Sequence, residues 1–448
     1  MAEIDKLIGA RIAKARKRKG WPQALLGDLA ERSESWVSQV ERGAIPLDSV
    51  VTAEKLAGLL EVATPYLLAF DVRHPAAEVD APSLGSHRPS PASARTARPD
   101  AESSDAVLRR TFNLGALAGV TTALAGLSPD AQAQTAQSPR GTLDRPTVDE
   151  LRSNGAFYRR SYKSFPAATL VPVAHSQIEL VLSLRPKDQP AELRTLLLAH
   201  MAEMACLAAC LLSLDLADRQ KADSYMDMGY EIGKEIDSPE LLALVLGGRA
   251  FNASYGGDPE SGLDYALAAV DRAERGASRR MLAWTNAVAS EMYASTGDER
   301  GFGSSLEEAR TVLSGPMDDE RWGGIAWFDL SKADAYEGSD LVRLGRYREA
   351  LPSLDQAIDR LPEEMMRHRC TAYISRAEAN AGANDIEAAC ADGQAALDLV
   401  EKVQHRETLR RVSELHRSLR PHRTVAVRSL GEHVIDTRTL LKTAGSTV

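Results

Sequence analysis

The sequence predicts an all-α protein on three observations. Apolar residues make up 44% of the 448 positions but aromatic residues only 5%, which is low for a β-rich fold. Apolar residues recur with the helical period of about 3.6 residues along most of the chain. Short turns containing Gly or Asp separate these periodic segments. A chain of this length exceeds what one hydrophobic core serves, so we expect two or more domains.

The charge distribution separates the N-terminal region from the rest. The net charge of −9 argues against a protein coated with basic surface for nucleic acid. Between Lys6 and Lys19, however, there are seven Lys or Arg residues and no acid. This local positive charge favours contact with a polyanion near the N-terminus.

The first predicted helix covers residues 4–19, where the apolar residues follow the helical period. Its basic residues, including Arg11, Lys14 and Arg16, are expected to face solvent. Gly20 is placed to close this helix.

Two shorter helices are predicted next. Pro22 suits the first turn of the second helix, and the side-chain amide of Gln23 and the nearby free N–H groups suit a DNA phosphate. Ser33 is placed to cap the third helix, and Gly43 is placed to end it. Two helices joined by a tight turn are typical of a helix that enters a DNA groove.

The third helix has two kinds of surface. Val37 and Val40 are expected to point into the core. The other faces carry side chains suited to base edges or phosphates, namely Ser35, Trp36, Gln39 and Arg42.

Further helices are predicted at 47–60 and 64–68, which gives five helices within about seventy residues. The sequence segments GARIAKARKRKGWPQ, SESWVSQVERG and LAGLLEV, in this order, resemble the lambda-repressor/Cro-like (XRE) DNA-binding domain. We therefore expect residues 1–72 to form a helix-turn-helix DNA-binding domain.

The resemblance implies that Gln23 contacts the DNA backbone and that the third helix lies at the groove. Trp36 has an alternative role, which is to cover the hydrophobic seam between helices. Glu34 and Trp36 replace the basic or small polar residues often found there, so the base preference does not carry over. The predicted DNA-binding residues are Gln23, Ser33, Glu34, Ser35, Trp36, Ser38, Gln39, Arg42, Arg11 and Lys14.

Residues 73–146 are rich in Pro, Ala, Ser and Asp and predict a flexible linker. Within it, an apolar helix is predicted at 106–128, where Arg109 and Arg110 precede an apolar run at 112–127 that resembles a twin-arginine export signal. Sixteen helical residues span about 24 Å, less than the roughly 30 Å of a membrane interior. A docking or dimerisation helix is therefore favoured over membrane attachment.

Residues 147–420 predict paired amphipathic helices. The clearest copy is LVRLGRYREALPSLDQAIDRLP, in which residues counted from Gly345 recur at the offsets of a tetratricopeptide repeat. Weaker copies are counted from Gly257, Gly297 and Asn384. We expect a tetratricopeptide-repeat α-solenoid with a concave inner wall, and a capping helix and tail at 421–448.

Few residues in the sequence suggest catalysis or metal binding. Cys206 and Cys210 lie one turn apart near His200, but their apolar surroundings favour core packing over a metal site. Four cysteines without a CxxC pair, and no apolar run at the start of the chain, predict a cytoplasmic location. We expect no enzyme, no cofactor and no metal.

The joining of such a DNA-binding domain to such repeats resembles the Rgg/PlcR-like peptide receptors. In these, Asn and Arg side chains of inward helices clamp a peptide backbone. The candidate ligand-binding residues are Arg249, Asn252, Trp284 and Asn286. They are alternatively ordinary helix-surface or inter-repeat residues.

These features predict a homodimeric transcription regulator that binds a roughly palindromic operator in double-stranded DNA and is controlled by a signalling peptide or protein partner. The alternative is a tetratricopeptide-repeat scaffold or adaptor, held at a membrane through residues 112–127.

Overall fold

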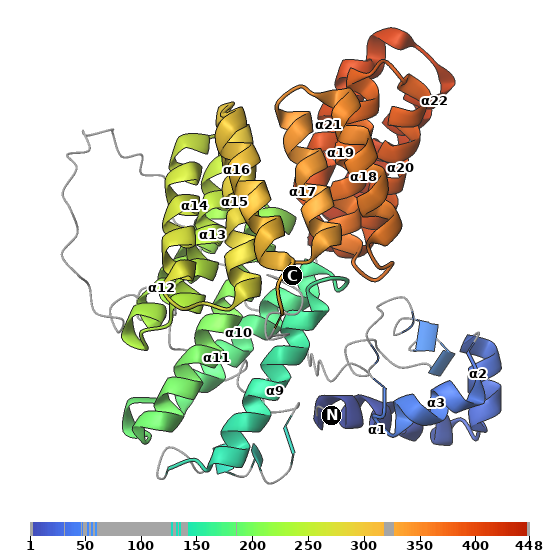
Figure 1. Cartoon of the computed structure of the whole chain (residues 1–448). Coiled ribbons are helices and arrows are strands. Elements are labelled where there is room, and N and C mark those ends of the chain that lie inside the picture. The colour runs from blue at the N-terminus through green and yellow to red at the C-terminus, as the bar shows by residue number, and fades with distance from the viewer. Residues whose placement is uncertain are drawn as a thin grey trace, which may run out of the picture.

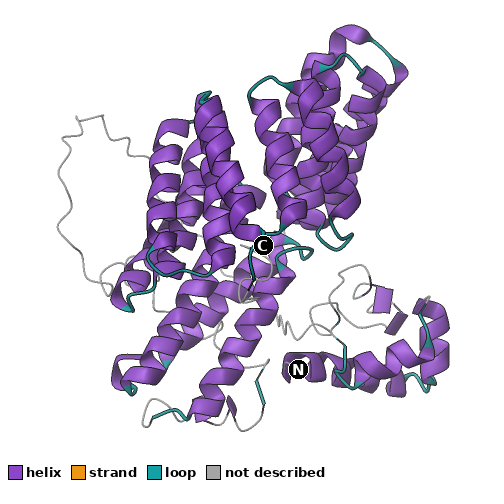
Figure 2. Cartoon of the chain, viewed as in Figure 1, coloured by secondary structure: helices purple, strands orange, loops and turns teal. Residues whose placement is uncertain are grey.

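The structure is a computed structural model that describes residues 3–30, 32–45, 142–184, 186–317 and 327–445, together with isolated positions at 47, 52–60 and 127–135. Helices, turns and loops make up all of these residues, and no strand occurs among them (Figure 2). The predicted all-α fold is confirmed.

Three complete helices lie in the described part of the N-terminal unit (Figure 1). They are α1 (Glu3–Arg18), α2 (Gln23–Ala30) and α3 (Glu34–Glu41), within two residues of the predicted bounds. Positions in the helix predicted at 47–60 are described only in part, and the helix predicted at 64–68 lies outside the described residues.

The rest of the described chain is an array of helices that pack mainly on their neighbours in sequence (Figure 1). It consists of α9 (Arg145–Ser161), α10 (Ala167–Ser183), α11 (Ala191–Cys210), α12 (Arg219–Glu235), α13 (Pro239–Tyr255), α14 (Pro259–Glu274), α15 (Arg279–Thr296), α16 (Glu299–Leu313), α17 (Leu330–Arg343), α18 (Tyr347–Arg360), α19 (Met366–Gly382), α20 (Ile386–Val403), α21 (Arg406–Leu419) and α22 (Val425–Gly445).

The four residues from which the repeats are counted occupy equivalent turns. Gly257, Gly297, Gly345 and Asn384 have φ of +99°, +80°, +74° and +70°, and each lies between the two helices of a hairpin. Only Gly and a few polar residues adopt this region readily, which explains the residue types. The hairpin stack is as expected, and its assignment as tetratricopeptide repeats stays a prediction.

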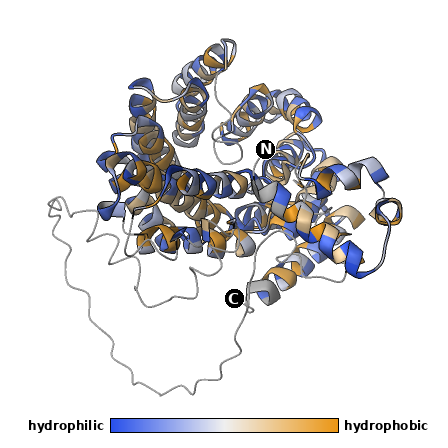
Figure 3. Cartoon of the chain, turned by 90° about the horizontal axis from the view of Figure 1, so that it is seen from below, coloured by the Kyte–Doolittle hydropathy of each residue, from blue (hydrophilic) through white to orange (hydrophobic). Residues whose placement is uncertain are grey.

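Small residues let the helices of a hairpin approach closely. Gly338 on α17 leaves room for Leu354 on α18, since a Cβ there would lie 2.4 Å from the leucine Cγ. Buried apolar residues accordingly form clusters that join neighbouring helices, and the ribbons in Figure 3 carry both hydrophobic and hydrophilic residues along each helix. The array is thus a packed layer of helix pairs.

Among the described residues, one helical stretch, Ala191–Asp215, is long and apolar enough to cross a membrane by length and composition alone. In this fold it is a core element, because 83% of its apolar window is buried among other helices. Cys206 and His200 lie on it, and His200 Nε2 is 3.1 Å from Gln177 Oε1. The described residues contain no cluster of three groups suited to a metal ion.

The end of the predicted linker packs on α9. Leu127, Ala131 and Leu143 are buried, and both the backbone N–H and the hydroxyl of Ser128 donate to Glu150. The rest of the apolar segment at 106–128 lies outside the described residues.

The N-terminal unit contacts the array through α1 and α9 (Figure 1). Ile8 and Ile12 of α1 belong to the same apolar cluster as Leu151 and Tyr158 of α9. Burial raises the pKa of the Tyr158 phenol, and the nearby guanidinium of Arg11 partly offsets this effect. Arg11 therefore lies on the side of α1 that faces the array.

Candidate DNA-binding interface

Helix α3 begins with the predicted cap. The Ser33 hydroxyl accepts a hydrogen bond from the backbone N–H of Trp36 at 3.1 Å, and Ser33 itself is extended, with φ −75° and ψ 155°. The cap satisfies one of the free N–H groups at the helix start. The remaining N–H groups of this exposed first turn are available to a phosphate.

The two faces of α3 differ as the pattern predicts. Val37 and Val40 are buried at 1% and 2% exposure and hold the helix against α1 and α2. The opposite side is exposed at Ser33, Glu34, Ser35 and Arg42 and half-buried at Trp36, Ser38 and Gln39.

The polar side chains of the open face are partly ordered by one another. Gln39 Nε2 donates to the Ser35 hydroxyl at 3.1 Å, and Arg42 Nε donates to the carbonyl of Ser38 at 3.1 Å. Gln39 lies one helical turn after Ser35, which is in the exposed first turn of α3. A glutamine amide placed there pairs with an adenine edge in the major groove.

The position of Trp36 is compatible with both of its proposed roles. The ring is half-buried against the core, and the guanidinium of Arg32 lies over it at 5.6 Å from the ring centre. This placement accommodates the seam-covering role and leaves one edge of the ring at the surface.

Arg16 and Glu41 form an ion pair that the sequence analysis missed. Arg16 Nε lies 2.6 Å from Glu41 Oε1, with the two side chains 9% and 5% exposed. Hydrogen bonding to Glu41 raises the pKa of Arg16 above its usual value. The expectation that Arg16 faces solvent is wrong, because the carboxylate of the ERG segment compensates its burial.

Glu41 also fixes the start of α2. Gln23 Nε2 donates to Glu41 Oε2 at 2.7 Å, so one carboxylate joins α1, α2 and α3. The predicted phosphate-binding side chain is therefore oriented by the end of α3. The opposite signs of Arg16 and Glu41, 25 residues apart, were the available signal.

A close backbone approach sets the angle between α1 and α3. A Cβ on Gly9 would lie 2.2 Å from the carbonyl oxygen of Val40 and 2.7 Å from that of Glu41. Glycine is thus required on α1 where it crosses the end of α3.

Residues 7–69 match the family model of a helix-turn-helix domain. This match supports a DNA-binding regulator of the XRE-like helix-turn-helix type. No curated protein and no solved structure matches the chain.

The two basic candidates on α1 of the helix-turn-helix domain lie differently. Lys14 is exposed, whereas Arg11 is half-buried on the side toward α9. Only Lys14 is therefore placed as a free surface charge for DNA in this arrangement.

The four predicted ligand-binding residues do not form one cluster. Arg249 donates to Asp227 at 2.6 Å, and Asn252 accepts from Ser213 and donates to Asp223, each at 2.6 Å. Asn286 is buried and donates to the carbonyl of Leu282. Trp284 is 5% exposed and lines a cavity.

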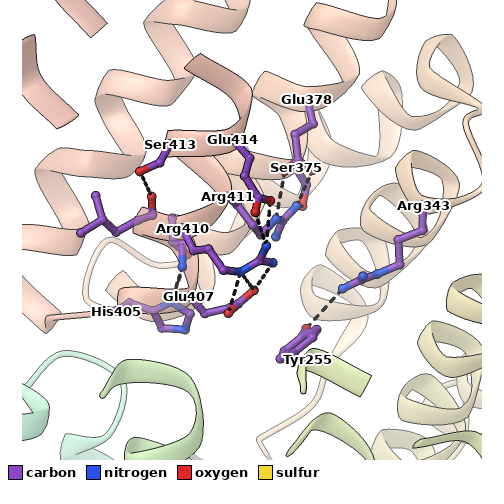
Figure 4. Close-up of polar contacts among 12 residues, drawn as sticks. Tyr255, Arg343, Ser375, Glu378, His405, Glu407, Arg410, Arg411, Ser413 and Glu414 are labelled. Carbon is purple, nitrogen blue, oxygen red and sulfur yellow. Dashed lines mark hydrogen bonds and ion pairs between the residues drawn. The ribbon is translucent and has the colours of Figure 1, made fainter. Parts of the chain in front are cut away.

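That cavity opens into an outer groove of about 660 Å³, lined by α17, α19 and α21. Figure 4 shows its wall of matched charges. Arg411 pairs with Glu378 at 2.6 Å, and Arg410 pairs with Glu407 at 2.5 Å and with Glu414 at 2.7 Å.

Proposed function

We propose that this protein is a transcription regulator that binds a roughly palindromic operator in double-stranded DNA as a homodimer. The observation that carries the proposal is the exposed, Ser33-capped start of α3 within a matched helix-turn-helix domain. One such domain makes few contacts with DNA. Two domains in a dimer, bound to half-sites about 34 Å apart, bind with a higher combined affinity.

Sequencing the DNA retained by the full-length protein at moderate salt tests this proposal. A palindromic motif with two half-sites is expected, together with a steep loss of affinity as salt rises. Recovery of random sequence would reject specific recognition. Light scattering of the protein with and without the recovered duplex tests the dimer.

We also propose that a peptide or protein partner controls the regulator through the outer groove. A peptide backbone carries both donors and acceptors, which suits a wall in which Arg410 and Arg411 alternate with carboxylates. Regulation requires that the partner bind one arrangement of the two DNA-binding domains better than the other.

The rival proposal is a scaffold or adaptor, because the helix-pair array offers a large surface for a protein partner. Cell fractionation separates the two. The regulator is expected with the chromosome in the cytoplasm, and an adaptor attached through residues 112–127 is expected with membranes.

A further inference from the structure

The inner end of the outer groove is a smaller cavity of about 130 Å³ between helices of the array, which we call the inner cavity. Tyr255, Arg343, Glu407 and Arg411 line both spaces, so the two are continuous. Figure 4 shows that Arg343, on α17, donates a hydrogen bond to the hydroxyl of Tyr255, on α13, at the junction of the two spaces. A ligand that enters the inner cavity from the outer groove therefore passes these four residues.

The arginines that line the inner cavity are matched by carboxylates. Arg343 lies 2.6 Å from Glu291, and Arg367 lies 2.8 Å from Asp215. Arg411 is held by Glu378, as described above. These pairs leave little net charge on the part of the wall they form.

Lys332 is the exception. It lines the inner cavity and is 3% exposed, and its backbone N–H donates to Asp329. Within the described part of the chain its ammonium forms no ion pair. Burial lowers the pKa of Lys332 to about 7, and the negative charge of Asp329, which forms no ion pair with the ammonium, offsets this effect only in part.

His368 adds an unsatisfied ring nitrogen beside Lys332. Its Nδ1 is buried and has no hydrogen-bond partner among the described residues. Burial, followed by the charge of Lys332, lowers the pKa of His368 well below its usual value, which keeps the ring neutral. A neutral ring protonated at Nδ1 donates one hydrogen bond.

The other walls are aromatic. Trp284, Tyr336, Phe251 and Tyr162 come from four different parts of the array and surround the space. Trp284 fits because Gly247 has no side chain, since a Cβ there would lie 2.4 Å from the indole. A cavity of about 150 Å³ holds benzene, so the inner cavity, at about 130 Å³, has the size of a single ring.

We propose that the inner cavity binds an aromatic ring carrying a carboxylate, with the carboxylate on Lys332 and His368 and the ring between Trp284 and Tyr336. A carboxylate has two oxygens, one for each donor, and neutralises the buried ammonium. The same chemistry is offered by a free aryl carboxylate and by the C-terminal Phe of a peptide. We assign the free acid, because the volume of the inner cavity matches a single ring.

Isothermal titration of the full-length protein, without DNA, tests this assignment with matched probes. Benzoate and phenylacetate are expected to bind, and benzamide, which has the same shape without the charge, is expected to bind at least about tenfold more weakly. Equal binding of benzoate and benzamide, or no binding of either acid at about 10 mM, would overturn the proposal.

The variant Lys332→Met is expected to lose benzoate binding at least about tenfold while melting at an equal or higher temperature. The control Lys221→Met removes an exposed lysine that pairs with Asp218 and is expected to bind as the native protein does. Unchanged binding in Lys332→Met would overturn the assignment. The comparison of benzoate with benzamide on the native protein stands even if this variant fails to fold.

The peptide Gly-Gly-Phe distinguishes the two sources. Binding of the free acids as tight as or tighter than that of the peptide supports a small metabolite. Binding of the peptide at least about tenfold tighter overturns the choice of source and keeps the ring-plus-carboxylate chemistry. A role for this ligand in controlling DNA binding would rest on the proposed function. The titration is done without DNA, so a failure of operator binding would leave the ligand-binding result intact.

Discussion

Tyr158 and Tyr162 lie one helical turn apart at the C-terminal end of α9, the first beside Arg11 of the helix-turn-helix domain and the second in the wall of the inner cavity. Arg367 donates to the carbonyl of Tyr162 and lies over its ring at 4.9 Å. A single rigid element therefore touches both the cavity wall and the DNA-binding domain. Displacement of Tyr162 by a ligand is expected to move the contact at Arg11.

Replacement of Arg11 tests this contact. Arg11→Ala is expected to increase amide hydrogen exchange in α1 and in the second half of α9, because α1 loses a contact with the array. Lys14→Ala removes the same charge from the exposed side of α1 and is the control. Equal exchange in the two variants would mean that Arg11 does not hold the domain on α9.

Replacement of Glu41 tests the ion pair at the centre of the helix-turn-helix domain. Glu41→Gln leaves Arg16 buried without a carboxylate and is expected to destabilise the domain by about 3 kcal/mol. The loss should appear as a lower first melting transition in calorimetry. Glu34→Gln, on the exposed start of the same helix, should melt as the native protein does.

Replacement of Ser33 tests the cap of α3. Ser33→Ala is expected to cost about 1 kcal/mol in the unfolding of the domain, since the N–H of Trp36 loses its acceptor. Ser33→Asp keeps an acceptor and should restore most of that stability. Failure of Asp to restore it would assign the loss to another contact of Ser33.

Buried histidines predict acid sensitivity of the array. Burial lowers the pKa of His200 and of His405 to about 3, whereas burial raises that of Asp215 to about 6. Between pH 6.5 and 3 the unfolded chain binds more protons at each histidine, so stability falls as the pH falls. Below pH 6 the folded chain binds more protons at Asp215 than the unfolded chain does, so this group stabilises the fold as the pH falls. Its contribution offsets the loss of stability from about one histidine.

Thermal melting between pH 7 and 5 measures this effect. His405→Asn is expected to reduce the pH dependence by at most about 1.4 kcal/mol per pH unit, the value for one proton. His422→Asn, at an exposed position, is the control. An unchanged slope in His405→Asn would show that this ring is not held neutral in the fold.

The local features of the fold were predictable from sequence, and the long-range ones were not. The Ser33 cap and the buried Val37 and Val40 follow from spacing within one helix. The positive φ of Gly345 and Asn384 likewise follows from a repeated turn.

The pair of Arg16 with Glu41 depends instead on how α1 crosses α3, which periodicity does not specify. Asn252 looks like a peptide clamp in sequence, yet Ser213 and Asp223 from neighbouring segments occupy its amide. The inner cavity was missed for the same reason. Lys332 and His368 can be recognised as parts of one candidate site only in the fold, where α17 and α19 bring both to the inner cavity.

The central claim is that the exposed face of α3 reads base pairs. Sequencing of DNA selected from a random pool by the native protein, Gln39→Ala and Lys14→Ala measures this directly. Gln39→Ala is expected to change the preferred base at one position of each half-site, and Lys14→Ala to weaken binding to all sequences alike. The same selected sequences for all three proteins would contradict the assignment of α3 as the reading helix.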